Sequence, residues 1–118
     1  MMLGAGSCDA IDNDPDVLAV ARENAALNGL AVTVDGRDVS DVEGLFGVVV
    51  ANIRAAILIG MAEHLRARTS GLLLLSGVLG SEEAEVRAAF EAIGMHHEQT
   101  SRSDSDGDDC WVAMVMRP

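Results

Sequence analysis

Three polar side chains in this 118-residue chain stand where they could hold a small molecule. Asp12, Asp38 and Asn52 each come at or just after the end of an expected β-strand. In open α/β sheets, ligands bind beyond the carboxyl ends of the strands. An acid at such an end can accept hydrogen bonds from both hydroxyls of a ribose, and each charge-assisted bond contributes about 1.5 to 3 kcal/mol. The spacing therefore predicts a nucleoside-binding edge.

Each of these residues also has a plainer interpretation. Asp12 could simply belong to the turn Asp12-Asn13-Asp14, and Asp38 could be an ordinary loop acid instead of a hydrogen-bond acceptor for an adenine amino group. The segment Gly4-Ala5-Gly6-Ser7 is glycine-rich, but a cofactor-binding glycine loop needs a helix between itself and the next acidic strand end. Asp12 follows Gly6 too closely for that, so residues 3–7 are interpreted as a turn that enters a strand.

The residue types that support other chemistries are poorly placed. The acidic stretch 103–109 fails the calcium-loop spacing, because Gly107 is fourth from Asp104 where the pattern needs a glycine in sixth place. His96 and His97 are adjacent and would point to opposite faces of a strand, and His64 stands alone. No serine–histidine–aspartate set or activated cysteine suggests nucleophilic catalysis. Group transfer by positioning is the chemistry that remains.

The elements that would position these residues alternate along the chain. Strands are expected where β-branched and aliphatic runs occur, and helices where apolar residues recur at helical spacing. The expected strands are 8–12, 31–35, 48–51, 72–76, 95–100 and 110–116, and the expected helices are 15–27, 53–68 and 81–93. This order predicts an α/β fold with a mainly parallel sheet, helices on both faces and an antiparallel C-terminal hairpin.

Local signals mark the ends of the helices. Asp14-Pro15 supplies an N-cap followed by proline at the first helical position, and Asn28-Gly29 stops that helix. Thr69-Ser70-Gly71 is expected to close the second helix. Ser81 is expected to cap the third, and Gly94 to end it.

Composition narrows the class of protein. The length suits one domain, and the 49% hydrophobic content is enough for a core. A net charge of −11 repels phosphate backbones and argues against a nucleic-acid partner. Cys8 and Cys110 are far apart and are expected to be reduced thiols. No signal peptide or membrane span is recognised, which predicts a soluble cytoplasmic protein.

Five segments together resemble one protein family, the PrmA-type ribosomal protein methyltransferases, which are class I adenosylmethionine-dependent enzymes. They occur in the family's order and at family-like spacing over nearly the whole chain. The segments are 9–15 (DAIDNDP), 21–29 (ARENAALNG), 48–53 (VVVANI), 73–77 (LLLSG) and 111–113 (WVA).

The resemblance implies roles for the candidate residues. Asp12 matches the acid that holds the cofactor ribose, Asn13 joins it as a cofactor-binding candidate, and Asp38 matches the acid near the adenine. Asn52 matches the asparagine at the mouth of the site, where it would orient an amine. The implied cofactor is S-adenosyl-L-methionine, and the implied reaction is methyl transfer to amino groups of a ribosomal protein.

The chain also departs from the family pattern. Residues 1–118 are expected to form a single, partial catalytic domain, an incomplete Rossmann-like sheet whose central first strand and glycine-rich loop would precede Met1. Cofactor binding is accordingly expected to be weak. Arg54 stands where the family usually has an apolar residue. The strands that end at Asp12 and Asn52 would have unpaired inner edges, so self-association is expected to be possible.

Two other functions stay open at this point. The chain could be a non-catalytic assembly module derived from a methyltransferase, which uses its unpaired strand edges to bind itself or a partner. It could also bind a nicotinamide cofactor, since Asp12 would suit that ribose too, although the phosphate loop of such enzymes is equally missing.

Overall fold

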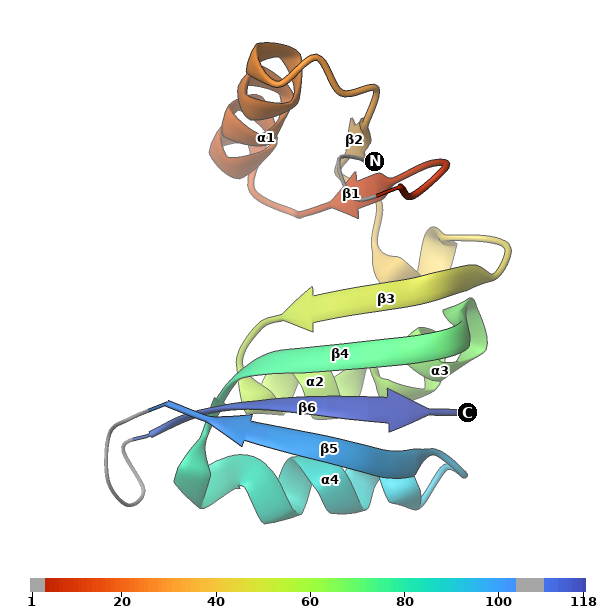
Figure 1. Ribbon diagram of the computed structural model, residues 1–118, viewed down its shortest axis with the longest axis vertical. Helices are drawn as coiled ribbons and strands as arrows, with labels where there is room; N and C mark the ends of the chain where they lie inside the picture. The colour runs from red at the N-terminus through yellow and green to blue at the C-terminus, as the bar shows by residue number, and fades with distance from the viewer. Residues whose placement is uncertain (1–3, 104–109) are drawn as a thin grey trace. The chain divides into compact units, whose positions relative to one another are not determined.

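The computed structural model describes residues 4–103 and 110–118, and strands and helices alternate along the chain (Figure 1). Contacts divide the chain into two units, Met1–Val42 and Glu43–Pro118. The elements of the first unit are β1 (Asp9–Ile11), α1 (Pro15–Leu27), β2 (Thr33–Asp35) and the 3-10 helix η1 (Val39–Asp41). The elements of the second are β3 (Phe46–Asn52), α2 (Ala55–Gly60), α3 (Ala62–Arg68), β4 (Thr69–Leu79), η2 (Gly80–Glu82), α4 (Glu83–Glu91), β5 (His96–Arg102) and β6 (Trp111–Arg117).

The first unit is a small strand–helix–strand motif. Its two strands pair in parallel, with Asp9 opposite Thr33 and Ile11 opposite Asp35. Helix α1 starts as predicted, because the side chain of Asp14 accepts a hydrogen bond from the Asp16 N–H at 2.9 Å and a proline follows the cap. Asn28 caps its other end, so both predicted limits of this helix are confirmed.

The second unit contains a four-stranded sheet in the order β3-β4-β6-β5. Strands β3 and β4 are parallel, and β6 runs antiparallel to both β4 and β5. The predicted antiparallel pairing of the two C-terminal strands is thus confirmed. The prediction of a mainly parallel sheet is wrong for the described residues, whose strand pairs divide evenly, because β6 pairs with β4 as well as with β5.

One face of this sheet carries the core. Figure 1 shows α2 and α3 behind the sheet, α4 packs against both of these helices and against β4 and β5, and β4 and β6 each carry a series of buried side chains. They alternate along the strands, as they must on a pleated sheet. The largest fully buried side chains of the chain are Phe90, Leu58, Leu73, Leu75, Met114, Met116, Val78, Val86 and Val112. Within this unit the described helices therefore cover one sheet face, whereas helices on both faces were expected.

Three local expectations in the second unit are corrected. The helix predicted over 53–68 is divided into α2 and α3 at Met61. Thr69 begins β4 instead of a closing turn, and its buried hydroxyl donates to the Leu65 carbonyl at 2.8 Å, which satisfies the last turn of α3. Ser81 lies within η2, and the N-cap of α4 is Glu82, which makes no side-chain capping bond to that helix. The Glu82 carboxylate accepts the Leu79 N–H at 3.0 Å, at the start of η2.

Strands β1 and β3 belong to separate sheets, and among the described residues each pairs with one neighbour only. That a central strand is missing between them stays a prediction, as does the assignment of residues 1–118 to a single domain. No described helix has the length and apolar character needed to cross a bilayer. Both cysteines are free thiols.

Candidate functional site

The turn after β1 carries the first two candidate residues. Asp12 is half-buried directly beyond the strand, and its N–H donates to the Asp35 carbonyl at 3.3 Å, which holds the ends of β1 and β2 together. One carboxylate oxygen of Asp12 accepts the Asp14 N–H at 2.9 Å. Asn13 is exposed on the same turn. Asp12 is therefore a turn residue, as its simpler interpretation predicted. A carboxylate can accept more than one hydrogen bond, so this role in the turn leaves acceptor positions for a ligand.

Asp38 lies just beyond the end of β2 and caps η1. Its Oδ1 accepts hydrogen bonds from both the N–H and the hydroxyl of Ser40, each at 2.9 Å. The side chain is exposed. Asp12, Asn13 and Asp38 thus all lie at the carboxyl end of the β1–β2 pair in the first unit, whereas Asn52 belongs to the second unit.

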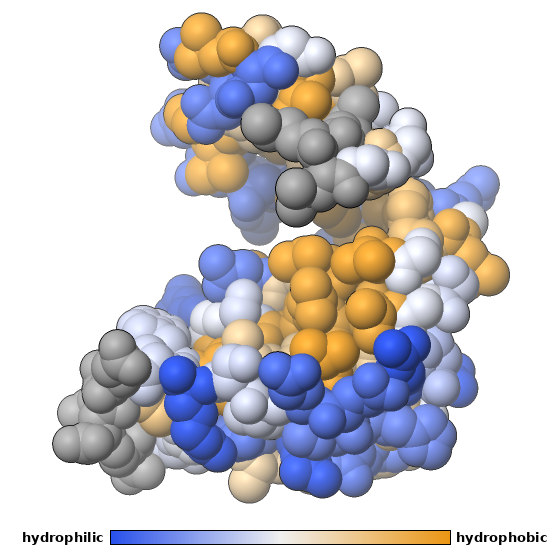
Figure 2. All heavy atoms as spheres, viewed as in Figure 1, coloured by the Kyte–Doolittle hydropathy of each residue, from blue (hydrophilic) through white to orange (hydrophobic). Residues whose placement is uncertain are grey.

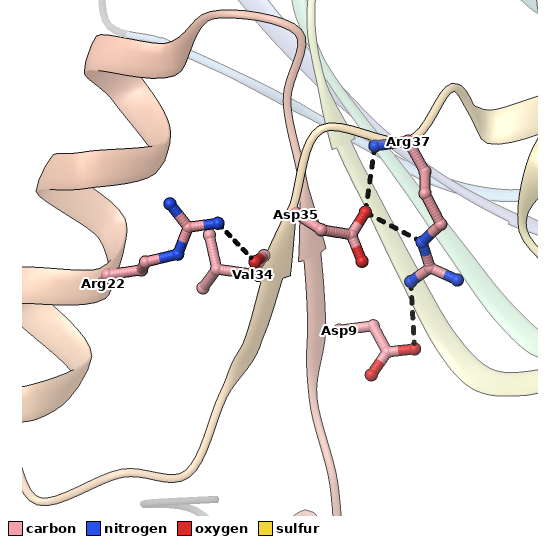
Figure 3. A network of polar contacts seen from close by, with 5 residues as sticks. All are labelled: Asp9, Arg22, Val34, Asp35 and Arg37. Carbon is pink, nitrogen blue, oxygen red and sulfur yellow. Dashed lines mark hydrogen bonds and ion pairs between the residues drawn. The ribbon is translucent and has the colours of Figure 1, made fainter.

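An ion-pair network in the first unit was not anticipated from the sequence. Figure 3 shows the guanidinium of Arg37 between the carboxylates of Asp35 and Asp9, with Nε 2.8 Å from Asp35 Oδ1 and Nη2 3.8 Å from Asp9 Oδ2. Hydrogen bonds from the side chain and backbone of Arg37 lower the pKa of Asp35, and the Asp35 carboxylate in turn raises the pKa of Arg37. Arg22 of α1 donates to the Val34 carbonyl at 2.9 Å.

This network separates structural acids from candidate ligand-binding acids. Asp35 is paired with Arg37 at 2.8 Å, and Asp9 is a second, more distant partner of the same guanidinium at 3.8 Å. Asp12 has no ion pair within residues 4–103 and 110–118, so its charge can be met by hydroxyl donors of a ligand. The Asp-Gly-Arg turn at 35–37 was the sequence signal that could have revealed this division.

Asn52 is the last residue of β3, as predicted, and its side chain is exposed. The following residue stays attached to the neighbouring strand, because the Ile53 N–H donates to the Ser76 carbonyl at 3.2 Å. Gly77 lies against Asn52 so closely that a Cβ on it would stand 2.9 Å from Asn52 Oδ1. Asn52 thus places an exposed amide, with a carbonyl oxygen and two N–H groups, beside Gly77 at the carboxyl end of β3.

A pocket of about 540 Å³ opens beside Asn52 within the second unit. It is lined by residues from the ends of four strands. They are Asn52, Ser76, Gly77, Ser101–Ser103 and Trp111–Ala113. Sequence reasoning assigned no role to Trp111 or Gly77, although both belong to segments that carry the family resemblance. A nucleoside-sized or smaller molecule fits such a volume.

No cluster of metal-ligating side chains is found among the described residues. The aspartates at 104, 106, 108 and 109, rejected above as a calcium loop, lie outside them. His97 Nε2 is 2.6 Å from the Thr100 hydroxyl, a local contact within β5. In the first unit, the carboxylates and amide of Asp12, Asp38 and Asn13 suit hydroxyl and amino groups of an organic ligand, and in the second unit the amide of Asn52 suits a polar group of a ligand.

Comparison with known proteins gives one consistent family. The family model "Ribosomal protein L11 methyltransferase (PrmA)" matches residues 1–118. A ribosomal protein L11 methyltransferase from Pelobacter propionicus is 42% identical over 119 residues, which cover 98% of this chain and 37% of that protein. The chain therefore spans little more than a third of the length of this relative.

Solved structures agree on the fold. A ribosomal protein L11 methylase from Lactobacillus delbrueckii subsp. bulgaricus matches 98% of this chain and 59% of its own, with a TM-score of 0.86 and 28% identity. The magnesium protoporphyrin IX methyltransferase ChlM from Synechocystis PCC 6803, solved with bound SAH, matches 99% of this chain and 66% of its own, with a TM-score of 0.77. At 16% identity the second match supports the fold alone.

Proposed function

The chain belongs to the ribosomal protein L11 methyltransferase family, and on that premise we propose that its residues form part of a site that transfers a methyl group from S-adenosyl-L-methionine to an amino group of a ribosomal protein. The observation that carries the proposal is the family match over residues 1–118. The chain spans 37% of the length of the Pelobacter relative. That this chain takes part in the methyl transfer named for the full-length relative is therefore also a proposal. A cytoplasmic location remains a prediction.

Asp12 is proposed to hold the ribose of the cofactor. Its second carboxylate oxygen makes none of the described hydrogen bonds that shape the turn, and its charge has no ion-pair partner among the described residues. Asn13 offers an exposed amide on the same turn, and Asp38 is proposed to meet the adenine amino group. The SAH bound to the Synechocystis enzyme supports a cofactor of this class for the fold.

Asn52 is proposed to orient the acceptor amine. When bound, S-adenosyl-L-methionine supplies a methyl group on a positively charged sulfur. The amine nitrogen would approach that carbon in line and as the neutral amine, because its lone pair forms the new N–C bond while the methyl C–S bond breaks and the sulfur leaves as a neutral thioether. The methylated nitrogen would then release a proton to solvent. The side-chain carbonyl of Asn52 can accept an N–H of the amine and fix its direction without a covalent intermediate.

The cofactor role is tested by substitution of Asp12 with the isosteric asparagine. Oδ1 still accepts the Asp14 N–H, so the turn is kept, while the charge is lost. Amide signals of the ¹⁵N-labelled chain are followed during titration with S-adenosyl-L-methionine. We expect signals of 12, 13 and 38 to move in the wild type and affinity to fall about tenfold or more in Asp12→Asn.

Asp41→Asn is the matched control, because Asp41 is an exposed acid of the same unit. It should bind the cofactor like the wild type. Absence of shifts at 12, 13 and 38 at millimolar cofactor, or equal affinity of Asp12→Asn and wild type, would refute the cofactor role. The same titration tests the predicted weakness of binding, which a micromolar affinity would contradict.

An assembly module is the second candidate function. Strand β3 has one neighbour among the described residues, and it exposes Val48 and Val50 by 57% and 66%. Figure 2 shows hydrophobic side chains gathered over β3 and β4 on the sheet face without helices. Uncharged edge strands of this kind pair readily with a second copy. Sedimentation at rising concentration would show dimers that Val50→Lys abolishes; a monomer throughout removes this candidate.

A further inference from the structure

The turn that follows β2 lies against the candidate ribose acid. The Asp12 N–H donates to the carbonyl of Asp35, the last residue of β2, at 3.3 Å. Gly36 lies beside Asp12 as well, because a Cβ on Gly36 would stand 3.6 Å from the Asp12 carbonyl oxygen, an ordinary contact distance. The position of Asp12 therefore depends on where residues 35 and 36 lie.

Arg37 fixes this turn through its backbone and its side chain. The Arg37 N–H and Nε both donate to Asp35 Oδ1, at 2.9 and 2.8 Å, so the two residues are joined twice across the turn. Figure 3 shows that the same guanidinium also reaches β1, where Nη2 is 3.8 Å from Asp9 Oδ2. One side chain thus links the turn after β2 to the neighbouring strand.

Few other described contacts hold this end of the first unit. Strands β1 and β2 pair over three residues each, and Leu18 is the one buried apolar side chain described there. A two-stranded pair of this length is marginally stable alone. The ion pair itself is partly exposed, with 37% of the Arg37 side chain and 34% of the Asp35 side chain accessible, so solvent weakens it. We therefore expect its loss to move Asp12 locally and to reduce ligand affinity only a few-fold.

The guanidinium is directed to acids other than Asp12. The described ion pairs of Arg37 are with Asp9 and Asp35, which leaves the charge of Asp12 for hydroxyl donors. We propose that Arg37 is a positioning residue for the cofactor ribose: it closes the turn at residues 35–37 and thereby holds Asp12 where its carboxylate meets the ribose hydroxyls. Arg37 acts through Asp12 and need not touch the ligand. This role rests on the proposed function, because Asp12 binds the ribose only if the chain binds the cofactor.

Two variants separate positioning from a simple effect of charge. Arg37→Lys keeps the positive charge but replaces the planar fork of donors with one ammonium group, which cannot occupy the Nε and Nη2 positions together. Arg37→Gln removes the charge as well. If Arg37 positions Asp12, both variants should show the same kind of defect. Wild-type behaviour of Arg37→Lys in both measurements below would mean that only the charge matters, and would overturn the proposal.

The first measurement needs no cofactor. The amide proton shift of Asp12 in the ¹⁵N-labelled full chain is followed against temperature, since an amide bonded to the Asp35 carbonyl changes less than one bonded to water. We expect the Asp12 signal to move and to become more temperature-dependent in Arg37→Gln and Arg37→Lys, while the signals of α1 stay in place. An unchanged Asp12 signal in both variants overturns the proposal, whether or not the cofactor binds.

The second measurement is a double-mutant cycle with S-adenosyl-L-methionine. Arg37→Gln should weaken binding about three- to fivefold, as expected for the loss of partly exposed ion pairs. In the Asp12→Asn background the same substitution should cause little further loss, because Arg37 acts through Asp12. Equal losses in the two backgrounds overturn the proposal. Absence of cofactor binding by the wild type refutes the proposed function instead, and the Asp12 amide then decides whether Arg37 positions that residue.

Arg22→Gln is the matched control. Arg22 is the other arginine of the first unit and donates to the Val34 carbonyl at 2.9 Å, so its loss loosens the same strand one residue before the turn. It should leave the Asp12 amide and the cofactor affinity at their wild-type values. Changes as large as those of Arg37→Gln would mean that Arg37 only stabilises the unit in general, which refutes the positioning role. If Arg37→Gln unfolds and loses the α1 signals, Arg37→Lys carries both measurements.

Discussion

The two units of the chain are stabilised in different ways. The second has a four-stranded sheet with three helices packed on one face and holds almost all of the buried apolar residues. In the first, Leu18 is the one buried apolar side chain among the described residues. Its two short strands pair over three residues each, and the Arg37 ion pairs with Asp9 and Asp35 add to that pairing. A two-stranded pair of this size is marginally stable alone. The proposed cofactor-binding residues thus belong to the unit expected to be less stable. Asn52, which is proposed to orient the acceptor amine, belongs to the unit expected to be more stable.

The largest expected effect comes from the core of the second unit. Phe90 is fully buried between α4 and the sheet, so Phe90→Ala should reduce the free energy of unfolding by about 3 to 5 kcal/mol. Denaturant unfolding followed by Trp111 fluorescence measures it, because that residue lies in this unit. Leu45→Ala, at an exposed position of the same unit, is the control and should change stability by less than about 0.5 kcal/mol. Equal effects of the two substitutions would mean that burial of Phe90 does not stabilise the second unit.

A smaller effect is expected in the first unit at the cap of α1. Asp14→Ala removes the acceptor for the Asp16 N–H and should cost about 1 kcal/mol of local stability. Hydrogen exchange should speed up along α1, while the Trp111-monitored transition of the second unit stays unchanged. Asp14→Ser, which keeps a capping oxygen, should restore protection. A shift of the Trp111 transition in Asp14→Ala would show that the units unfold together.

The smallest effect concerns pH. The pKa of Asp35 is lowered from its usual 3.8 by hydrogen bonds from Arg37, so its pairing stabilises the first unit above pH 3.8 and is lost as the pH falls through the lower folded value. A carbon-detected titration should place the Asp35 midpoint below 3.8. In Arg37→Gln the midpoint should return towards that value. A wild-type midpoint at or above it would remove Arg37 as the stabilising partner.

Local sequence signals predicted most elements and several of their ends. The Asp14-Pro15 start of α1, its stop at Asn28, the end of β3 at Asn52 and the antiparallel pairing of β5 with β6 were all expected. These features depend on residues close together in the chain, where capping bonds and side-chain alternation act. The helix break at Met61 and the early start of β4 were missed, because packing against the sheet overrode the helical periodicity.

By itself the sequence determined the types of the elements, the family and the positions of Asp12, Asn13, Asp38 and Asn52 at strand ends. Only the tertiary structure decided that β6 enters the sheet between β4 and β5, that Arg37 lies between Asp9 and Asp35, and that Gly77 and Trp111 meet Asn52 around one pocket. The physical reason is that strand order, a bulge and a pocket arise from pairing between residues far apart in the chain. No short window of sequence carries information on such partners.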